Sequence, residues 1–220
     1  MARYGIACST VTGDGTGSFE FKAASRLYTE LQCGSYIFVD ADYGRNLDRE
    51  GAPTKAFAPS LFVWATVMSR PAEDRAIIDA GLKALAFDSG SPLVCDEPAA
   101  TYERASDEHG RLAVSAATNR LGLGDKMRLI PGHCDPTVNL YDWYVCVGGN
   151  RVEQVWPITA RGAVYRRSSY GLPGQAARQT ATFSAPCSFI AALAAGTSLS
   201  RGRQKSKCST RTSPNPLGRL

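Results

Sequence analysis

The first 160 residues consist of short apolar runs separated by clusters of glycine, proline and polar residues. The runs are rich in β-branched and aromatic residues, a composition that favours strands. We therefore expect strands at residues 4–12, 35–39, 60–68, 110–117 and 126–130. Because turn residues punctuate these short strands and long helical periods are rare, the pattern predicts a mainly β body.

A β-hairpin is predicted near the end of this body. Residues 143–147 and 151–156 flank Gly148-Gly149-Asn150, a turn sequence that permits positive φ. Two other segments are ambiguous. Residues 19–31 fit either a helix or a strand, and residues 72–86 begin like a helix although residues 77–81 could equally form a short strand and turn.

The pattern changes from about residue 165, where Ser, Arg, Gly, Gln, Thr and Pro dominate. The last stretch holds almost no apolar residues, so it cannot bury enough surface to offset the entropy of ordering. We therefore expect residues 164–220 to form a disordered basic tail.

Charge follows the same division of the chain. Of 220 residues, 25 are Lys or Arg and 20 are Asp or Glu, for a net charge of +5. All 20 acidic residues but only 15 basic ones lie in residues 1–156, whereas residues 157–220 hold ten basic residues and no acid. The body is thus acidic, which argues against a specific nucleic-acid binder. The tail could contact polyanions, but it lacks the interleaved aromatic residues of single-strand binders.

Composition also indicates in which cellular compartment the protein is located. The longest apolar candidate, residues 185–199, is interrupted by Ser188, Gly196 and Thr197 and is too short for a membrane span. No secretory signal is visible, and the seven cysteines form no CxxC pair. These features predict reduced thiols, a cytoplasmic location and no membrane partner.

A candidate metal site lies in Pro131–Trp143, which reads PGHCDPTVNLYDW. If the backbone there is extended, His133 and Asp135 point to one side and Cys134 to the other. An imidazole and a carboxylate suit Zn, Mn or Mg and leave positions open for water or substrate. The alternative is a surface loop that carries an isolated histidine.

A second cluster, residues 10–18, reads TVTGDGTGS and follows a predicted strand. Glycine N–H groups and hydroxyls in such a loop can surround a phosphate. The loop lacks the GK[ST] ending of a nucleotide P-loop, and a plain turn is the alternative. We interpret Asp40 and Asp42 as part of a solvated strand end. His109 is expected in an exposed polar turn, and no functional role is assigned to it.

Together these segments resemble the D-threonine aldolase and D-serine dehydratase family, pyridoxal-phosphate enzymes of the alanine-racemase-like fold type. The resemblance rests on PGHCDPTVNLYDW, on VTGDGTGSFEF and on YTELQCGSYIFVDADYGRN, and it covers residues 5–163. It implies an α+β, mainly β fold with three parts. Residues 1–26 would be the last portion of a (β/α) barrel with its phosphate loop, residues 27–163 a β-rich domain with the metal motif, and residues 164–220 the tail.

The resemblance also implies the chemistry. Pyridoxal 5'-phosphate and a divalent metal (Mn, Zn or Mg) would serve the retro-aldol cleavage of a β-hydroxy-D-amino acid to glycine and an aldehyde. His133 and Asp135 would hold the metal, and the candidate base would be His133 or a water on the metal. The cofactor-binding residues would be Gly13, Gly15, Thr16, Gly17 and, as a weaker candidate, Tyr36. Similar enzymes are often homodimers.

The sequence departs from the family pattern in ways that matter. None of Lys22, Lys55, Lys83 or Lys126 lies in a motif like that of the family's Schiff-base lysine, so we expect the chain alone to be inactive. Asp14 replaces a common glycine of the phosphate loop. The order His-Cys-Asp favours aldolase chemistry over the His-x-Cys of the dehydratase branch, although ammonia elimination and a non-catalytic metal-binding β domain stay open as alternatives.

Overall fold

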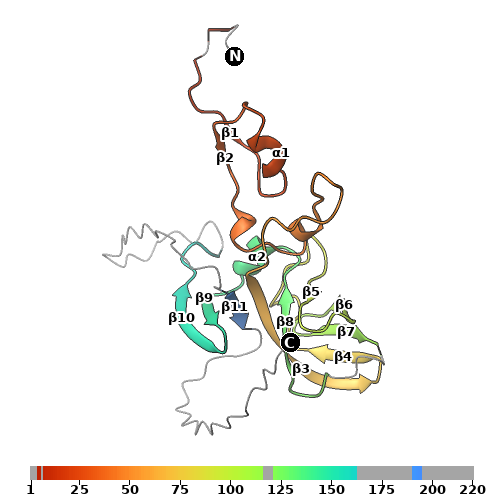
Figure 1. Ribbon diagram of the computed structural model, residues 1–220. Helices are drawn as coiled ribbons and strands as arrows, with labels where there is room; N and C mark the ends of the chain where they lie inside the picture. Colours follow the sequence, from red (N-terminus) through yellow and green to blue (C-terminus); the bar gives the residue numbers. More distant parts are fainter. Residues whose placement is uncertain (1–3, 6, 116–120, 163–189, 195–220) are drawn as a thin grey trace, which may run out of the picture.

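The computed structural model describes residues 4–5, 7–115, 121–162 and 190–194, and these residues are mainly β, which confirms the predicted fold class (Figure 1). The α-helices are α1 (Phe19–Ala23) and α2 (Cys134–Val138), and 3₁₀ turns lie at Ser35–Ile37 and Tyr43–Arg45. The strands are β1 (Thr12–Gly13), β2 (Glu30–Leu31), β3 (Leu61–Ala72), β4 (Arg75–Ile78), β5 (Leu93–Val94), β6 (Ala100–Ala105), β7 (Gly110–Val114), β8 (Lys126–Ile130), β9 (Trp143–Gly148), β10 (Arg151–Pro157) and β11 (Ile190–Ala194). Helices of five residues are far shorter than the roughly 20 residues of a membrane span, and none of the described helices could cross a bilayer.

The N-terminal residues form a small βαβ unit. Strands β1 and β2 pair in parallel, Thr12 opposite Glu30, and α1 lies between them in the chain. This is the type of unit from which (β/α) barrels are built. It resolves the ambiguity of residues 19–31, which form a helix followed by a short strand.

Two predicted strands of this region are wrong. The strand expected at residues 4–12 is reduced to its end, because β2 offers only two residues as a partner. The strand expected at residues 35–39 is a 3₁₀ turn, closed by the Phe38 and Val39 N–H groups, which both donate to the Ser35 carbonyl. Tyr36 and Ile37 are exposed, whereas Val39 is buried, so the run lacks the alternating burial of a strand.

The main sheet has the strand order β10-β9-β11-β3-β4-β7-β6, and β8 pairs with both β3 and β5. The 12-residue strand β3 joins the two halves of the sheet: Val63–Thr66 pair with β8, and the part from Val67 onward pairs with β4. The register shifts between Val67 and Ser69 and again before Ala72, and such irregularities bend a strand. Figure 1 shows β3 passing from the β9–β10 hairpin to the β4–β7–β6 layer.

Several of the other predicted strands are confirmed, whereas β5 and β6 were not predicted. Residues 60–68, 110–117 and 126–130 correspond to β3, β7 and β8, and residues 75–78 take the strand alternative as β4. The hairpin β9–β10 is confirmed, with Gly149 at φ +58° in its turn.

Strand β11 is a difference from the sequence prediction. Residues 190–194 lie between β9, to which they are antiparallel, and β3, to which they are parallel. The disorder expected for residues 164–220 therefore does not hold for this strand. The other residues of the tail lie outside the described ranges.

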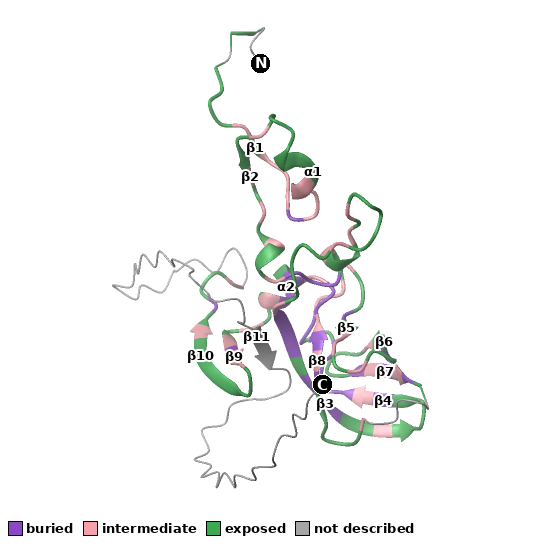
Figure 2. Ribbon diagram, in the orientation of Figure 1, coloured by how far each residue is buried: buried purple, intermediate pink, exposed green. Residues whose placement is uncertain are grey.

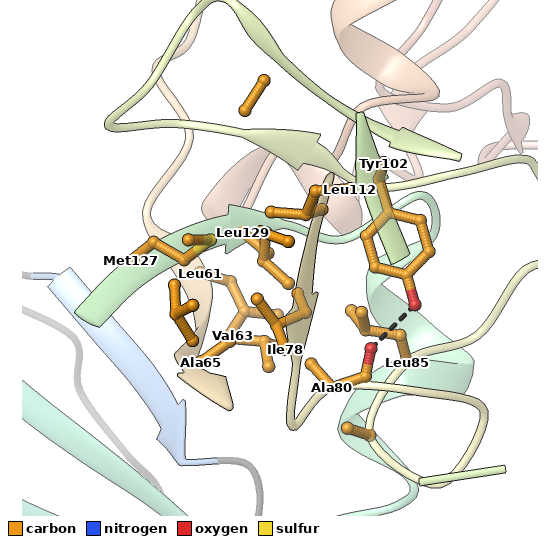
Figure 3. Packing of buried hydrophobic residues seen from close by; sticks show 14 of the residues in the cluster. Leu61, Val63, Ala65, Ile78, Ala80, Leu85, Tyr102, Leu112, Met127 and Leu129 are labelled. Atoms are coloured by element: carbon orange, nitrogen blue, oxygen red, sulfur yellow. Dashed lines mark hydrogen bonds between the residues drawn. The ribbon is translucent and has the colours of Figure 1, made fainter. Parts of the chain in front are cut away.

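The core lies on one side of β3. Leu61, Val63, Ala65 and Val67 alternate inward along the strand and are almost fully buried (Figure 2). They belong to one cluster with Ile78, Leu112, Met127 and Leu129, drawn in Figure 3. The Tyr102 hydroxyl donates to the Ala80 carbonyl at 2.7 Å, so the buried ring brings its polar end to a partner. Met127 and Leu129 anchor β8 in this core, and the metal motif begins directly after β8 ends.

Candidate functional site

The metal motif starts where β8 ends, and its backbone is not extended as expected. His133 is the N-cap residue of α2, with φ −141° and ψ 125°, and the helix begins at Cys134. Pro136 is compatible with this first turn, where a missing N–H costs nothing, and Asp135 interacts favourably with the helix dipole. The helical turn still brings His133 Nε2 within 3.8 Å of Asp135 Oδ2.

Asp40 supports this turn from a distant part of the chain. Its carboxylate is only 1% exposed and accepts the Cys134 N–H at 2.7 Å and the Tyr43 N–H at 3.0 Å. The neighbouring N–H groups of Ala41 and Asp42 donate to the carbonyls of Pro131 and Gly132. The prediction of a solvated strand end is therefore wrong for Asp40, because the hydrogen bonds to Cys134, Pro131 and Gly132 attach its segment to the metal motif.

Asp88 holds the imidazole of His133, and no sequence motif points to this aspartate. The two residues are 45 positions apart, and Asp88 Oδ2 lies 2.5 Å from His133 Nδ1. Burial lowers the pKa of His133, but the hydrogen bond to Asp88 and the charges of Asp88, Asp40 and Asp135 outweigh burial and leave this pKa raised. The same hydrogen bond is the main reason that the pKa of Asp88 is lowered.

Cys134 and Tyr144 are both neutral at this site. Burial, reinforced by Asp40 and Asp135, strongly raises the pKa of the Cys134 thiol, which lies 3.6 Å from Asp135 Oδ1. Burial also raises the pKa of Tyr144 to about 12, with Cys134 and Asp135 adding to the effect. A buried protonated thiol is a poor ligand, and a phenol with this pKa is no base at neutral pH.

The His133–Asp135 pair fits an open metal site. Bonds of about 2.0–2.2 Å from nitrogen and oxygen ligands would let one ion touch both atoms across their 3.8 Å separation. Among the described residues, no group of three or more His, Cys, Asp or Glu side chains is arranged around one ion. The remaining positions would thus fall to water or substrate, as a Lewis-acid site requires.

The glycine-rich loop combines packing constraints with an unpaired hydroxyl. A Cβ on Gly13 would lie 2.8 Å from the Tyr28 ring, and one on Gly17 would lie 2.6 Å from the Asn46 amide, whereas one on Gly15 would meet nothing within 4 Å. Two of the three glycines are therefore explained by internal contacts. The Thr16 hydroxyl is buried and, within the described residues, has no hydrogen-bond partner, which suits a phosphate donor.

Asp14 fits a phosphate less well. It adopts φ +68°, and its Oδ1 accepts a hydrogen bond from the Ser18 hydroxyl. Its Oδ2 is buried and, among the described groups, has no hydrogen-bond partner. A carboxylate oxygen in this loop would repel a phosphate, so the loop fits this group through Gly15 and Thr16 rather than through Asp14.

A small pocket lies beside this loop, lined by Thr16, Phe19, Val39, Tyr43, Asn46, Thr54 and Phe57. Tyr36 is not among the lining residues; its ring is exposed and packs 5.4 Å from that of Phe57. The segment 40–46 connects the two candidate sites, because Asp40 contacts the metal motif while Asn46 lies against Gly17. His109, in contrast, lies in the exposed turn between β6 and β7, as the sequence predicts.

Comparisons with known proteins agree with this fold. Residues 60–147 match the model of the putative serine dehydratase domain. The chain belongs to the D-threonine aldolase and D-serine dehydratase-like family.

Three relatives illustrate the range of this family. The chain is 53% identical over 158 residues to a D-threonine aldolase of Arthrobacter sp, covering 72% of the chain and 41% of the relative. It is 48% identical over 163 residues to the 3-hydroxy-D-aspartate aldolase of Paracoccus denitrificans, covering 73% and 42%. The crystal structure of D-threonine aldolase from Filomicrobium marinum matches with a TM-score of 0.69 and 46% identity, covering 74% of the chain and 44% of that structure. The chain thus spans less than half the length of the curated relatives it matches.

Proposed function

We propose that the chain is part of a lyase that cleaves β-hydroxy-D-amino acids to glycine and an aldehyde, with pyridoxal 5'-phosphate and a divalent metal. The observation that carries the proposal is the pairing of His133 Nε2 with Asp135 Oδ2 at 3.8 Å, with Nδ1 already bonded to Asp88. This pairing leaves two metal-capable atoms facing each other on a motif that resembles the metal motif of the D-threonine aldolase family.

Aldol cleavage is favoured over ammonia elimination by the state of Cys134. The thiol is buried and its pKa is strongly raised, whereas Asp135 carries an exposed carboxylate beside His133. The identity of 53% to a D-threonine aldolase also exceeds the 30% to the D-threo-3-hydroxyaspartate dehydratase of Delftia sp. (strain HT23).

Each site residue would have a distinct role in the reaction. A divalent ion on His133 and Asp135 would supply a Lewis acid that acidifies the substrate's β-hydroxyl, and pyridoxal 5'-phosphate would supply the electron sink. His133 has only one free ring nitrogen, because Nδ1 is bonded to Asp88. It could therefore hold the ion or take the hydroxyl proton, but not both at once. If Nε2 held the ion, water would have to accept the proton.

The phosphate of the cofactor would lie at Gly13, Gly15, Thr16 and Gly17. The Thr16 hydroxyl, which has no hydrogen-bond partner among the described residues, and the open space at Gly15 support this position. Tyr36 would be a minor contact at its edge. We further propose a cytoplasmic homodimer in which the βαβ unit continues a (β/α) barrel and residues up to 163 form the β domain.

A first experiment assays residues 1–220 with pyridoxal phosphate, Mn²⁺ and D-threonine. We expect no release of acetaldehyde and no Schiff-base absorbance, because none of Lys22, Lys55, Lys83 or Lys126 lies in a matching motif. Turnover by this chain would contradict that expectation and would require one of these lysines, or another amine, to bind the cofactor.

A second experiment tests the lyase itself through a chimera. In the Arthrobacter enzyme, the 158-residue stretch that aligns with this chain is replaced by the aligned part of the present sequence. We expect acetaldehyde release from D-threonine, its loss in His133→Ala, and its retention in His109→Ala, the only other histidine of the chain. A folded chimera whose activity survives His133→Ala would refute the assigned site.

A further inference from the structure

Asp88 belongs to a segment that is fixed against the metal motif at several points. The Ala86 N–H donates to the Thr137 hydroxyl at 3.1 Å, and the Tyr141 hydroxyl donates to the Ala84 carbonyl at 2.8 Å. Further along, Arg45 Nη2 donates to the Ser89 carbonyl at 2.7 Å. Asp88 lies between these anchors, so its backbone is held although its side chain is 53% exposed.

The same contacts hold the backbone of His133. The Thr137 hydroxyl that accepts the Ala86 N–H also donates to the His133 carbonyl at 2.7 Å. His133 and the Asp88 segment are therefore joined twice: through Thr137 at the backbone, and through the carboxylate at Nδ1. This double connection fixes the distance between the imidazole and the carboxylate before any ligand binds.

We propose that Asp88 is a positioning residue that selects the Nδ1–H tautomer of His133 and turns Nε2 toward Asp135. A carboxylate only accepts hydrogen bonds, so Nδ1 must carry the proton, and in the neutral ring Nε2 then carries the lone pair. That lone pair lies 3.8 Å from Asp135 Oδ2. The role in ion binding rests on the proposed function, whereas the choice of tautomer is a property of the chain without ligand.

The tautomer can be read directly, because the chain holds only two histidines. The full chain is labelled with ¹⁵N-histidine, and its imidazole resonances are recorded without metal, at a pH where the rings are neutral. We expect His133 to show the Nδ1–H form, and exposed His109 to show the tautomer mixture of a free imidazole. Asp88→Ala should shift His133 toward that mixture and leave His109 unchanged.

A conservative variant separates positioning from general structural damage. Asp88→Asn keeps an oxygen that accepts from Nδ1–H, so it should retain the Nδ1–H tautomer. Glu73→Ala removes an exposed carboxylate at the β3–β4 turn and should change nothing. The inference is overturned if His133 shows the Nε2–H form in the unaltered chain, or if Asp88→Ala leaves its resonances in place.

Binding of Mn²⁺ to the same chains, followed by calorimetry, tests the link to the metal. Loss of a carboxylate that orients a ligating histidine weakens metal binding by about 10–100-fold, and we expect this for Asp88→Ala with Asp88→Asn in between. Equal affinities of Asp88→Ala and the unaltered chain would overturn the positioning role. If the unaltered chain binds no Mn²⁺ while its tautomer is as expected, the proposed metal site fails and the choice of tautomer by Asp88 stands.

Discussion

At the scale of single residues, two buried polar side chains shape the turn around His133. Asp40 accepts the N–H groups of Cys134 and Tyr43, and Thr137 both accepts from Ala86 and donates to His133. Both side chains are almost completely excluded from solvent. Neither contacts the two metal-capable atoms, yet each connects the metal motif to a segment distant in the chain.

Thr137→Val should destabilise the protein by about 1–3 kcal/mol, because it keeps the shape of the side chain but leaves the Ala86 N–H without an acceptor in a buried site. The free energy of unfolding is measured with urea. Thr101→Val, on the exposed side of β6, is the matched control and should change stability by less than about 0.5 kcal/mol. Equal stabilities of the two variants would show that water replaces the Thr137 hydroxyl.

At the scale of elements, short apolar runs bounded by turn residues predict several of the strands. Strands β3 and β8 and the β9–β10 hairpin each carry an apolar face or a turn that permits positive φ, and each was predicted close to its bounds. Residues 35–39 have the composition of a strand but no partner strand, and composition cannot reveal a missing partner. The sequence motif points to His133 and Asp135. The contact of Asp88 with His133 arises from tertiary packing between residues 45 positions apart, and a single sequence carries no signal for such a contact.

Gly132 joins β8 to α2 and lies directly against the segment that carries Asp88. A Cβ at this position would lie 2.1 Å from the Gly90 carbonyl oxygen, which belongs to the backbone and cannot rotate away. Gly132→Ala should therefore push the Asp88 segment from His133, at a cost of about 1–3 kcal/mol in the free energy of unfolding.

The same Gly132→Ala variant should bind Mn²⁺ more weakly in calorimetry. Gly34→Ala is its control, since a Cβ there meets nothing within 4 Å and its φ is −96°. Unchanged metal binding by a destabilised Gly132→Ala protein would mean that the contact between these segments supports the fold but not the ion site.

At the scale of the whole molecule, the β9–β10 hairpin presents an apolar face to solvent. Register pairs Trp143 with Pro157, Val145 with Val155 and Val147 with Val152, so all six side chains share one face. The register shift between Val152 and Gln154 places both valines of β10 on that face. Val152 and Val155 are 60% and 52% exposed, and Trp143 is also exposed, as Figure 2 shows for the β10 ribbon.

Such a face promotes association, because contiguous exposed apolar patches are removed from water when molecules meet. Replacing Val152 and Val155 together by Lys should lower light scattering and the sedimentation-average mass of the chain at high concentration. The melting temperature should stay within a degree or two, since neither valine contributes to the core cluster. Gln32→Lys with Thr101→Lys adds the same charge at exposed polar positions and should leave association unchanged, which isolates loss of apolar surface from gain of charge. A fall of several degrees in the melting temperature of the valine double variant would show instead that this face is covered within the molecule.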